Sequence, residues 1–340
     1  MSSNVTLKEI AQELGLSTMT VSRAINNKGN VEKGTRDKIL AKAKSMGYTP
    51  NYLAKGLVSK KTFTIGVVIP EISHSFFPEA LRGIEEVVYE GGYQLILTHS
   101  AEQFEREKKA IEMLKSKRVD GIMISSSQTK NDYSYYESLK NSGIPFIFFD
   151  RCIEGLGVSC ISVNDKIGSK KITQHLIDHG YKKIAHLSGP INVSIGKKRF
   201  EGFEEAMEEN GLAINDKWIV ESGFQEEGGK LAMEKILSAP RKDWPEAIFA
   251  VNDPSAFGAI EALKGHGLSI PEDMAIVGFS DDIRAELLST PLTTVKQPAY
   301  RVGKKAAEKL ISIITSDTEH AENIEVLTEL RIRNSCGAHK

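Results

Sequence analysis

Cysteine, long apolar runs and enzyme signatures are the features that this sequence has least of. Its 340 residues include three cysteines, Cys152, Cys160 and Cys336, which form neither a Cys-x-x-Cys pair nor an even set, so we expect no disulfide framework. No run approaches the roughly 20 apolar residues of a membrane span, and polar residues occupy the place of a signal-peptide core. We therefore expect a cytoplasmic globular protein.

Motifs of nucleotide chemistry and of nucleophilic catalysis are also absent from the sequence. No G-x-G-x-x-G opens a helix after a strand, and neither G-x-x-x-x-G-K-[ST] nor G-x-S-x-G occurs. His175 and His179 lie four residues apart on a predicted helix, which suits a metal ion, but no third ligand accompanies them. We expect no enzyme, no metal and no other cofactor.

The net charge of −1 conceals an uneven distribution along the chain. Residues 1–61 have a net charge of about +7, which leaves about −8 for the remainder. A small basic segment on a larger acidic one suits a polyanionic partner for the basic segment alone. A solvated lysine-rich surface would give the same count, so the residue pattern has to decide between the two.

Short helices joined by a tight turn are predicted at the start of the chain. Thr6 and Glu9 form a capping box, apolar residues then recur at helical spacing, and Gly15 follows where a helix must stop. Ser17–Asn26 forms the second helix, and Thr35–Met46 a third. Two helices joined by a turn of this length are typical of a helix-turn-helix.

The second helix has one face for a small core and another for a partner. Val21 and Ile25 lie four residues apart on the inner face. The outer face keeps Thr18, Met19, Ser22 and Arg23. Because hydroxyls, a forked guanidinium and a soft apolar tip suit a DNA major groove, we predict that this is a recognition helix.

From Thr64 onward, apolar runs of buried-strand type alternate with helical segments. The runs lie at 64–70, 94–98, 121–125 and 145–149, and then at 183–190, 218–221, 247–251 and 275–279. Two successive doubly wound α/β lobes are predicted, followed by a helix over Tyr300–Ser316 and a last strand near Glu325–Arg333. Ligands of such sheets bind beyond the carboxyl ends of the strands.

Seven segments stand out by their order and spacing. They are TLKEIAQELGLSTMTVSRAI at 6–25, GYTPN at 47–51, AKGL at 54–57, IGVVIP at 65–70, FDR at 149–151, RFEGF at 199–203 and PLTTVKQP at 291–298. Together they resemble the LacI/GalR family of bacterial transcriptional regulators over essentially the whole chain. The resemblance implies an α/β fold in which a small all-α helix-turn-helix head precedes two doubly wound lobes, as in periplasmic binding proteins.

The resemblance also implies the limits of each part. The expected parts are the head at 1–49, a hinge helix and linker at 50–61, a first lobe at 62–163 and 293–321, and a second lobe at 164–292 and 322–335. The chain would cross between the lobes three times. Because no heptad repeat follows the second lobe, we expect a homodimer and not a tetramer.

The resemblance assigns DNA contacts to the head and the hinge. The expected residues are Thr6, Ser17, Thr18, Met19, Thr20, Ser22, Arg23, Asn26, Asn51, Ala54 and Leu57. Arg23 can fork onto guanine O6 and N7, with a phosphate contact as the alternative. Leu57 matches a leucine that wedges into a minor-groove step, with packing between hinge and core as the alternative.

A small-molecule effector is expected in the cleft between the lobes. The expected contacts are Ser73, Phe76, Asp150, Arg151, Arg199, Phe224, Asn252, Asp253 and Asp281. Phe76 and Phe224 would flank a ring, with core packing as the alternative, and the polar groups would hold hydroxyls. Ser280 replaces an acid of many relatives, and Val193 replaces an arginine of a purine-binding relative, so no particular ligand carries over.

We therefore expect a DNA-binding repressor that reads a palindromic operator as a homodimer. A small polar effector, a sugar or sugar derivative, would control its operator affinity, either by releasing DNA or by strengthening binding. One alternative is a cytoplasmic sugar-binding or carbohydrate-modifying protein with an incidental head. Another is a member of the family that responds to a phosphorylated carrier protein.

Overall fold

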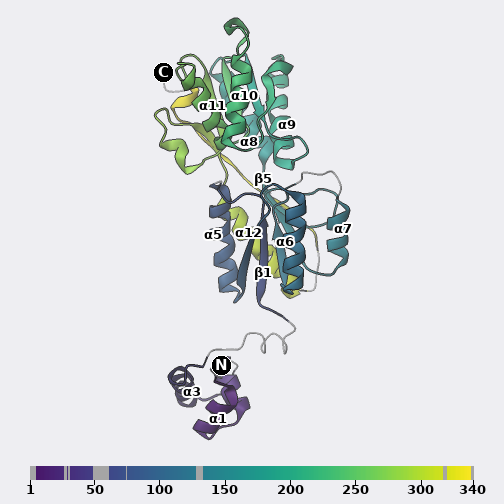
Figure 1. The fold of residues 1–340 in the computed structure, drawn as a ribbon, viewed down its shortest axis with the longest axis vertical. Helices are drawn as coiled ribbons and strands as arrows, with labels where there is room; N and C mark the ends of the chain where they lie inside the picture. The colour runs from purple at the N-terminus through teal and green to yellow at the C-terminus, as the bar shows by residue number, and fades with distance from the viewer. Residues whose placement is uncertain are drawn as a thin grey trace. The chain divides into compact units, whose positions relative to one another are not determined.

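The structure, a computed structural model, describes residues 5–26, 29, 31–48, 61–73, 75–127, 133–316 and 320–337 (Figure 1). The chain divides into two compact units, Met1–Thr62 and Phe63–Lys340. The expected DNA contacts Asn51, Ala54 and Leu57 lie outside the described residues, so their roles stay predictions.

Three helices are described in the first unit: α1 (Leu7–Leu14), α2 (Thr18–Ile25) and α3 (Lys33–Ser45). The predicted capping box is confirmed, because the Thr6 N–H donates to Glu9 Oε2 at 2.7 Å and the Glu9 N–H donates to Thr6 Oγ1 at 3.3 Å. Gly15 ends α1 with a φ of 61°. The small core consists of Ile10, Ala11, Val21, Ala24, Ile39 and Ala43.

The first lobe of the second unit is built on a parallel sheet with the strand order β11-β5-β4-β3-β1-β2. Its strands are β1 (Thr64–Ile69), β2 (Gln94–His99), β3 (Gly121–Ile124), β4 (Phe146–Phe149), β5 (Cys160–Val163) and β11 (Asn323–Val326). The strands β3, β4 and β5 are buried along their whole length, as continuous apolar runs predict for parallel strands covered on both faces.

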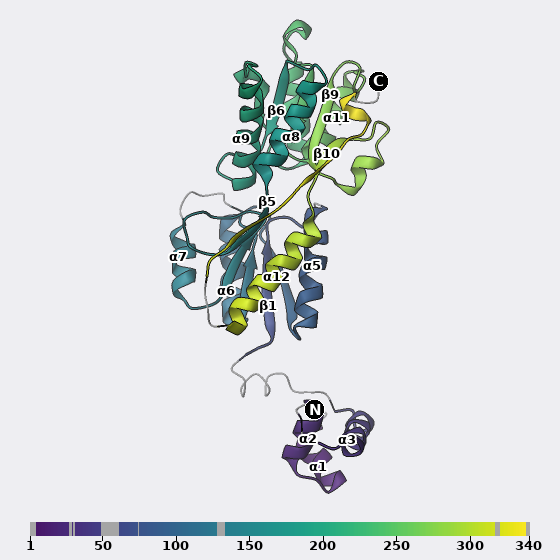
Figure 2. The same ribbon diagram turned by 180° about the vertical axis from the view of Figure 1, so that it is seen from behind.

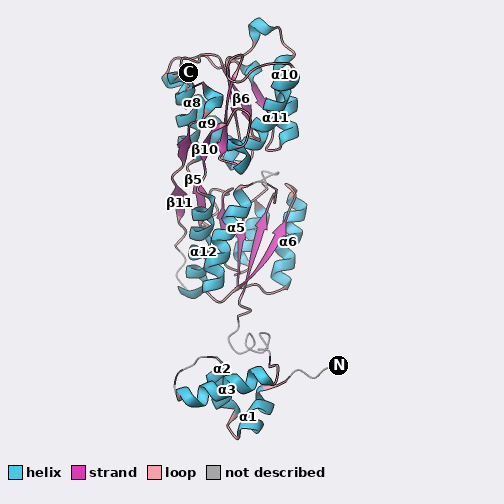
Figure 3. Cartoon of the chain, turned by 90° about the vertical axis from the view of Figure 1, so that its left-hand side faces the viewer, coloured by secondary structure: helices cyan, strands magenta, loops and turns pink. Residues whose placement is uncertain are grey.

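Helices cover both faces of this sheet. They are α5 (Phe76–Glu90), α6 (Phe104–Ser116), α7 (Ser134–Asn141) and α12 (Ala299–Ser316). Figures 2 and 3 show α5 and α12 on one face and α6 on the other. Buried side chains of α5 and α12 belong to a hydrophobic cluster that continues into the second lobe, and those of α6 and α7 belong to a separate cluster.

The second lobe repeats the arrangement with the strand order β12-β10-β9-β8-β6-β7. Its strands are β6 (Ile184–Ser188), β7 (Ile219–Glu221), β8 (Ala247–Ala250), β9 (Ala275–Ser280), β10 (Thr293–Lys296) and β12 (Glu329–Arg331), of which β12 runs antiparallel to β10. Its long helices are α8 (Asp165–Asp178), α9 (Ser194–Glu209), α10 (Glu226–Leu237) and α11 (Asp253–Gly265). The short 3-10 helices among the described residues are η1 (Asp216–Trp218), η2 (Arg241–Asp243), η3 (Ile283–Glu286) and η4 (Asn334–Cys336). In Figures 1 and 2, α10 and α11 cover one face of the sheet, and α8 and α9 cover the other.

Two of the expected lobe boundaries are wrong by one strand. The segment after residue 292 was expected in the first lobe, but β10 pairs with β9 of the second sheet. The segment after residue 321 was expected in the second lobe, but β11 pairs with β5 of the first sheet, and β12 follows as a separate strand. An apolar pattern identifies a strand without identifying the sheet that it joins, which explains both errors.

The cysteines also differ from the expectation of no disulfide framework. Cys152 and Cys160 form a disulfide with 5.9 Å between their Cα atoms, while Cys336 is a buried free thiol. Cys152 follows β4 and Cys160 begins β5, and these strands are neighbours in the sheet. Counting cysteines cannot reveal that adjacent strands bring two of them together.

No helix in the described ranges is long and apolar enough to cross a membrane.

Candidate functional site

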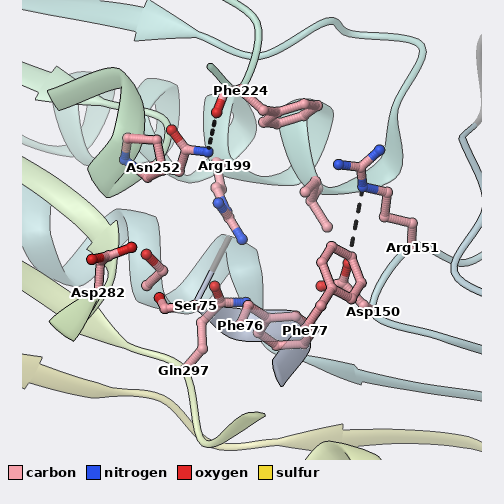
Figure 4. Close-up of a pocket in the computed structure, with 13 residues that line it drawn as sticks. Ser75, Phe76, Phe77, Asp150, Arg151, Arg199, Phe224, Asn252, Asp282 and Gln297 are labelled. Atoms are coloured by element: carbon pink, nitrogen blue, oxygen red, sulfur yellow. Dashed lines mark hydrogen bonds and ion pairs between the residues drawn. The ribbon is translucent and has the colours of Figure 1, made fainter. Parts of the chain in front are cut away.

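A cavity lies where the carboxyl ends of strands from the two lobes meet (Figure 4). We call it the inner cavity; its lining is Ser75, Phe76, Phe77, Asp150, Arg151, Ile195, Arg199, Phe224, Asn252, Pro254, Ser280, Asp282 and Gln297. Its volume is about 40 Å³, room for about three water molecules. The lining side chains therefore mainly contact one another, and a sugar ring needs them or the lobes to move apart.

Arg199 of α9 is held firmly by its own lobe. Its side chain is 2% exposed, and Nε and Nη2 lie 2.8 Å and 2.7 Å from Asp165 Oδ1. Nη1 donates to the Val251 carbonyl at 2.8 Å, and the guanidinium carbon lies 3.8 Å from the centre of the Phe279 ring. Arg199 is thus a fixed cation in the cavity wall.

Asp150 occupies a strained turn directly after β4. Its φ is 60°, an uncommon conformation for a residue other than glycine, and it is buried. The Ser125 hydroxyl donates to its Oδ2 at 3.2 Å. Burial raises the pKa of this carboxyl to about 6, opposed by the positive charge of Arg151. Strain and an elevated pKa at a cavity wall are typical of functional positions.

Arg151 joins the lobes through a cation–π contact. Nη1 and Nη2 donate to the two Glu102 carboxylate oxygens at 2.6 Å and 2.8 Å, a bidentate pair within the first lobe. The same guanidinium lies 4.7 Å from the centre of the Phe224 ring in the second lobe. The ring that was expected to stack on a ligand is therefore covered by the chain's own cation.

Asn252 and Asp253 begin α11 with different roles. The Asn252 amide donates to the Phe224 carbonyl at 2.9 Å and accepts from the Ser255 N–H at 2.9 Å, so this lining residue is oriented at both ends. Asp253 lies behind the wall, where it accepts from the Thr294 hydroxyl at 2.6 Å and the Asp282 N–H at 2.7 Å. Burial raises the Asp253 pKa to about 6.

Six of the nine expected effector contacts line the inner cavity, and three do not. The six are Phe76, Asp150, Arg151, Arg199, Phe224 and Asn252. Ser73 is exposed and bonds Glu71, Asp253 lies behind the wall, and Asp281 pairs with Arg333 at 2.8 Å. Ser75, Ser280 and Asp282 take the places expected for Ser73 and Asp281.

Gln297 is a lining residue that the sequence analysis missed. It is buried where the chain leaves β10 for α12, and its Nε2 has no hydrogen-bond partner among the described residues. A buried amide donor without a partner is costly, so it points to a ligand acceptor or water. Its place at a strand end was the signal that could have revealed it.

The expected metal-compatible pair has other partners in the structure. His175 Nε2 lies 3.2 Å from Cys336 Sγ, and His179 Nδ1 lies 2.7 Å from the His175 carbonyl oxygen. Within the described ranges, no group of three or more His, Cys, Asp or Glu side chains is arranged to hold a metal ion.

The recognition surface expected on α2 is exposed. Thr18, Met19 and Arg23 are exposed, and the Met19 side chain is 64% accessible, whereas Val21 and Ala24 face the head core. Ser17 Oγ accepts from the Thr20 N–H at 3.1 Å, which fixes the start of α2. The outer face of α2 is therefore available to a partner.

Comparisons with known proteins cover both units. Residues 6–51 match the family described as "Bacterial regulatory proteins, lacI family", and residues 62–334 match "Periplasmic binding proteins and sugar binding domain of LacI family". Over 336 residues the chain is 35% identical to the HTH-type transcriptional repressor PurR of Haemophilus influenzae, covering 97% of this chain and 98% of that protein.

Two solved structures are similar over nearly the whole chain. The transcriptional regulator CelR in complex with cellobiose is 28% identical with a TM-score of 0.74, covering 98% of this chain and 100% of the other. The lac repressor dimer, bound to operator and the anti-inducer ONPF, is 24% identical with a TM-score of 0.87, covering 98% and 99%, which bears on the fold alone.

Proposed function

Since the chain belongs to the LacI family of bacterial regulatory proteins, we propose that a neutral saccharide in the inner cavity controls its hold on operator DNA. The chain is a helix-turn-helix transcriptional regulator with a periplasmic-binding-protein-like core. In this proposal the lobes bind the saccharide, the head binds the DNA, and a dimer brings two heads to one operator. We further propose that it acts in the cytoplasm and catalyses no reaction.

The lining of the inner cavity is the observation that carries the saccharide proposal. Two acids, Asp150 and Asp282, balance two bases, Arg151 and Arg199, so an uncharged ligand is favoured. Serine hydroxyls and the amides of Asn252 and Gln297 offer donors and acceptors, while phenylalanine rings offer apolar faces. Saccharides combine many hydroxyls with an apolar ring face. The cellobiose in the CelR complex agrees with this class.

Contacts between the lobes stabilise one arrangement of the lobes, and a ligand can shift the population of that arrangement. Gln225 Nε2 donates to Glu71 Oε2 at 3.3 Å, and the Cys152 N–H donates to Ser194 Oγ at 3.3 Å. The Arg151–Phe224 contact also crosses the cleft. A saccharide that binds one lobe arrangement better shifts the population toward it, and the shift is limited by its difference in affinity for the two states.

We propose that α2 reads base edges in the major groove. In this proposal the exposed Arg23 forks onto guanine, and the exposed Thr18 and Met19 set operator preference through hydroxyl and apolar contacts. We propose phosphate contacts for residues at the ends or flanks of the two helices, which are Thr6, Ser17, Thr20, Ser22 and Asn26.

We also propose that two copies of the chain assemble on a palindromic operator. Ile283 and Leu287, in and just after η3 and four residues apart, are 78% and 79% exposed. Neighbouring large apolar side chains of this exposure are typical of an interface. A two-fold dimer presents two heads to two half-sites.

The proposal is tested by selecting bound duplexes from a random DNA pool and then titrating neutral saccharides against the selected duplex. We expect an inverted repeat, and at least one saccharide that changes operator affinity about tenfold, a coupling of about 1.4 kcal/mol. If only charged metabolites or a protein partner change the affinity, the saccharide proposal fails. A product detected by mass spectrometry would instead support the carbohydrate-modifying alternative.

A further inference from the structure

A second cavity of about 300 Å³ lies beside the inner one. We call it the outer cavity; residues from both lobes line it, among them Tyr133, Cys152, Glu154, Asn192, Ser194 and Lys198. We infer that it is a subsite for a second sugar unit, so that the effector is a neutral disaccharide or a longer saccharide. This inference rests on the proposed function and deepens it.

The two cavities are neighbours because consecutive residues line both. Arg151 lines the inner cavity and Cys152 lines the outer one, while Ile195 lines the inner cavity and Ser194 the outer one. The Cys152 N–H donates to Ser194 Oγ at 3.3 Å, so these two short segments meet between the cavities. A ligand that extends past Asp150 and Arg151 therefore reaches the outer cavity next.

The sizes of the cavities differ in a way that suits an extended ligand. The inner cavity is about 40 Å³ and the outer one about 300 Å³, which is the lower limit of typical ligand pockets. The outer cavity already has space for a sugar unit, whereas the inner one has to widen. Once the inner cavity has widened around the first sugar unit, the second unit therefore enters space that is already present in the outer cavity.

The charges of the outer cavity favour a neutral ligand over a phosphorylated one. Lys198 lies 3.3 Å from Glu154, and Lys197 lies 3.8 Å from Glu201. Each lysine that lines the cavity is therefore paired with a carboxylate that also lines it. A phosphate would compete with both carboxylates, whereas sugar hydroxyls can donate to them and accept from the lysines.

Apolar groups complete the lining. Tyr133 contributes a partly buried ring, and Ile191 contributes a side chain that is 68% exposed. An aromatic side chain beside amide, hydroxyl and charged groups suits a pyranose ring, which has both apolar C–H groups and hydroxyls.

The outer cavity also spans the two lobes. Glu154 belongs to the segment after β4 in the first lobe, and Lys198 belongs to α9 in the second, so their ion pair crosses the cleft. A sugar unit that replaces or bridges this pair acts on the lobe arrangement directly. The second unit thus contributes to control as well as to affinity.

Isothermal titration calorimetry on the full chain tests the subsite. The probes are glucose, galactose, mannose and xylose, the disaccharides made from them, and the 6-phosphates of the three hexoses. We expect one disaccharide to bind about tenfold or more tightly than its constituent monosaccharide. Tyr133→Ala reduces this preference about tenfold, and the matched variant Tyr133→Phe retains it.

Asn192→Ala provides a second variant of the outer cavity, and Lys217→Ala, exposed on η1 outside both cavities, is the surface control. Equal affinity for a monosaccharide and its disaccharide, or a preference that neither Tyr133→Ala nor Asn192→Ala changes, overturns the subsite while leaving the proposed function intact. Binding of the 6-phosphates alone overturns the neutral ligand. Binding of no saccharide at all overturns the proposed function and the subsite together.

Discussion

The Arg151 guanidinium lies 4.7 Å from the centre of the Phe224 ring, and the two residues belong to opposite lobes. Glu102 holds the same guanidinium by a bidentate ion pair, so the cation is positioned over the ring by its own lobe. A ligand that stacks on Phe224 has to displace this contact. The chain thus contains an internal competitor for its proposed effector.

Replacement of Arg151 by alanine is expected to raise saccharide affinity. A desolvated cation–π contact contributes about 1 to 2 kcal/mol, so its removal corresponds to about a 5- to 30-fold lower Kd. Calorimetric titration of the saccharide measures the change. Arg151→Lys keeps a cation near the ring and should change the Kd less. A weaker affinity in Arg151→Ala would mean that the guanidinium binds the ligand.

Replacement of Gln297 by methionine separates ligand binding from stability. Gln297 Nε2 is buried without a partner among the described residues, so a side chain of similar length should change the free energy of unfolding by less than about 1.5 kcal/mol. Saccharide affinity should fall about tenfold because a hydrogen bond to the ligand is lost. Thermal melting and calorimetry measure the two effects. Gln174→Met, on α8 outside both cavities, is the control, and an unchanged saccharide affinity in Gln297→Met contradicts the assignment.

Replacement of Arg199 by alanine is expected to destabilise the core. It leaves the Asp165 carboxylate buried without its cation, which costs about 3 to 5 kcal/mol. Denaturant unfolding followed by circular dichroism measures the loss. Lys197→Ala changes a cation on the same helix whose side chain is 64% exposed, and it should cost less than about 1 kcal/mol. Equal midpoints for the two variants would show that the buried pair is not stabilising.

The Asp253 carboxyl predicts a pH dependence of stability. Burial raises its folded pKa to about 6, above its unfolded value near 3.9, so the folded chain binds more protons between these values. This contribution is complete at low pH and is lost as pH rises through about 6. Relative to Asp253→Asn, the wild-type free energy of unfolding should fall by about 1 to 3 kcal/mol from pH 4 to pH 7. Parallel melting curves for the two proteins would contradict the raised pKa.

Arg23→Ala tests base reading by α2. Loss of a bidentate contact to guanine should weaken binding to the selected operator by about 1 to 3 kcal/mol and relax the preference at one base pair per half-site. Fluorescence anisotropy with matched and mismatched duplexes measures both. Lys38→Ala, exposed on α3, should weaken both duplexes alike. If Arg23→Ala also weakened binding to the matched and mismatched duplexes equally, Arg23 would contact phosphate and not a base.

Most elements of the fold are predictable from periodicity, but strand assignment is not. The expected strands at 64–70 and 275–279 appear as β1 and β9, and the expected helix at 300–316 appears as α12. A parallel strand that is covered by helices on both faces is apolar at nearly every position, and this makes it easy to recognise in the sequence. β10 was expected in the first lobe and lies in the second, whereas β11 was expected in the second lobe and lies in the first. Pairing between strands far apart in sequence depends on tertiary geometry, which a local pattern does not contain.

The site was predictable as a set of strand ends and less so as individual side chains. Asp281 was expected in the cleft, yet Ser280 and Asp282 line it. The reason is backbone conformation: φ is 136° at Ser280 and 61° at Asp281, which turns Asp281 toward Arg333 and Asp282 into the cavity. A shift of one residue along this turn therefore decides which aspartate lines the cavity and which forms an ion pair with Arg333.

The placement of β11 and β12 also has a consequence for synthesis of the chain. These neighbours in sequence form the edge strands of two different sheets. As a ribosome produces the chain, neither lobe can complete its sheet until residues 323–331 have emerged, although most of the first lobe is made before residue 164. Until then the hydrogen-bonding edges of β5 and β10 stay open to other strands. A message cut short after α12 would therefore yield two unfinished sheets and a product prone to aggregation.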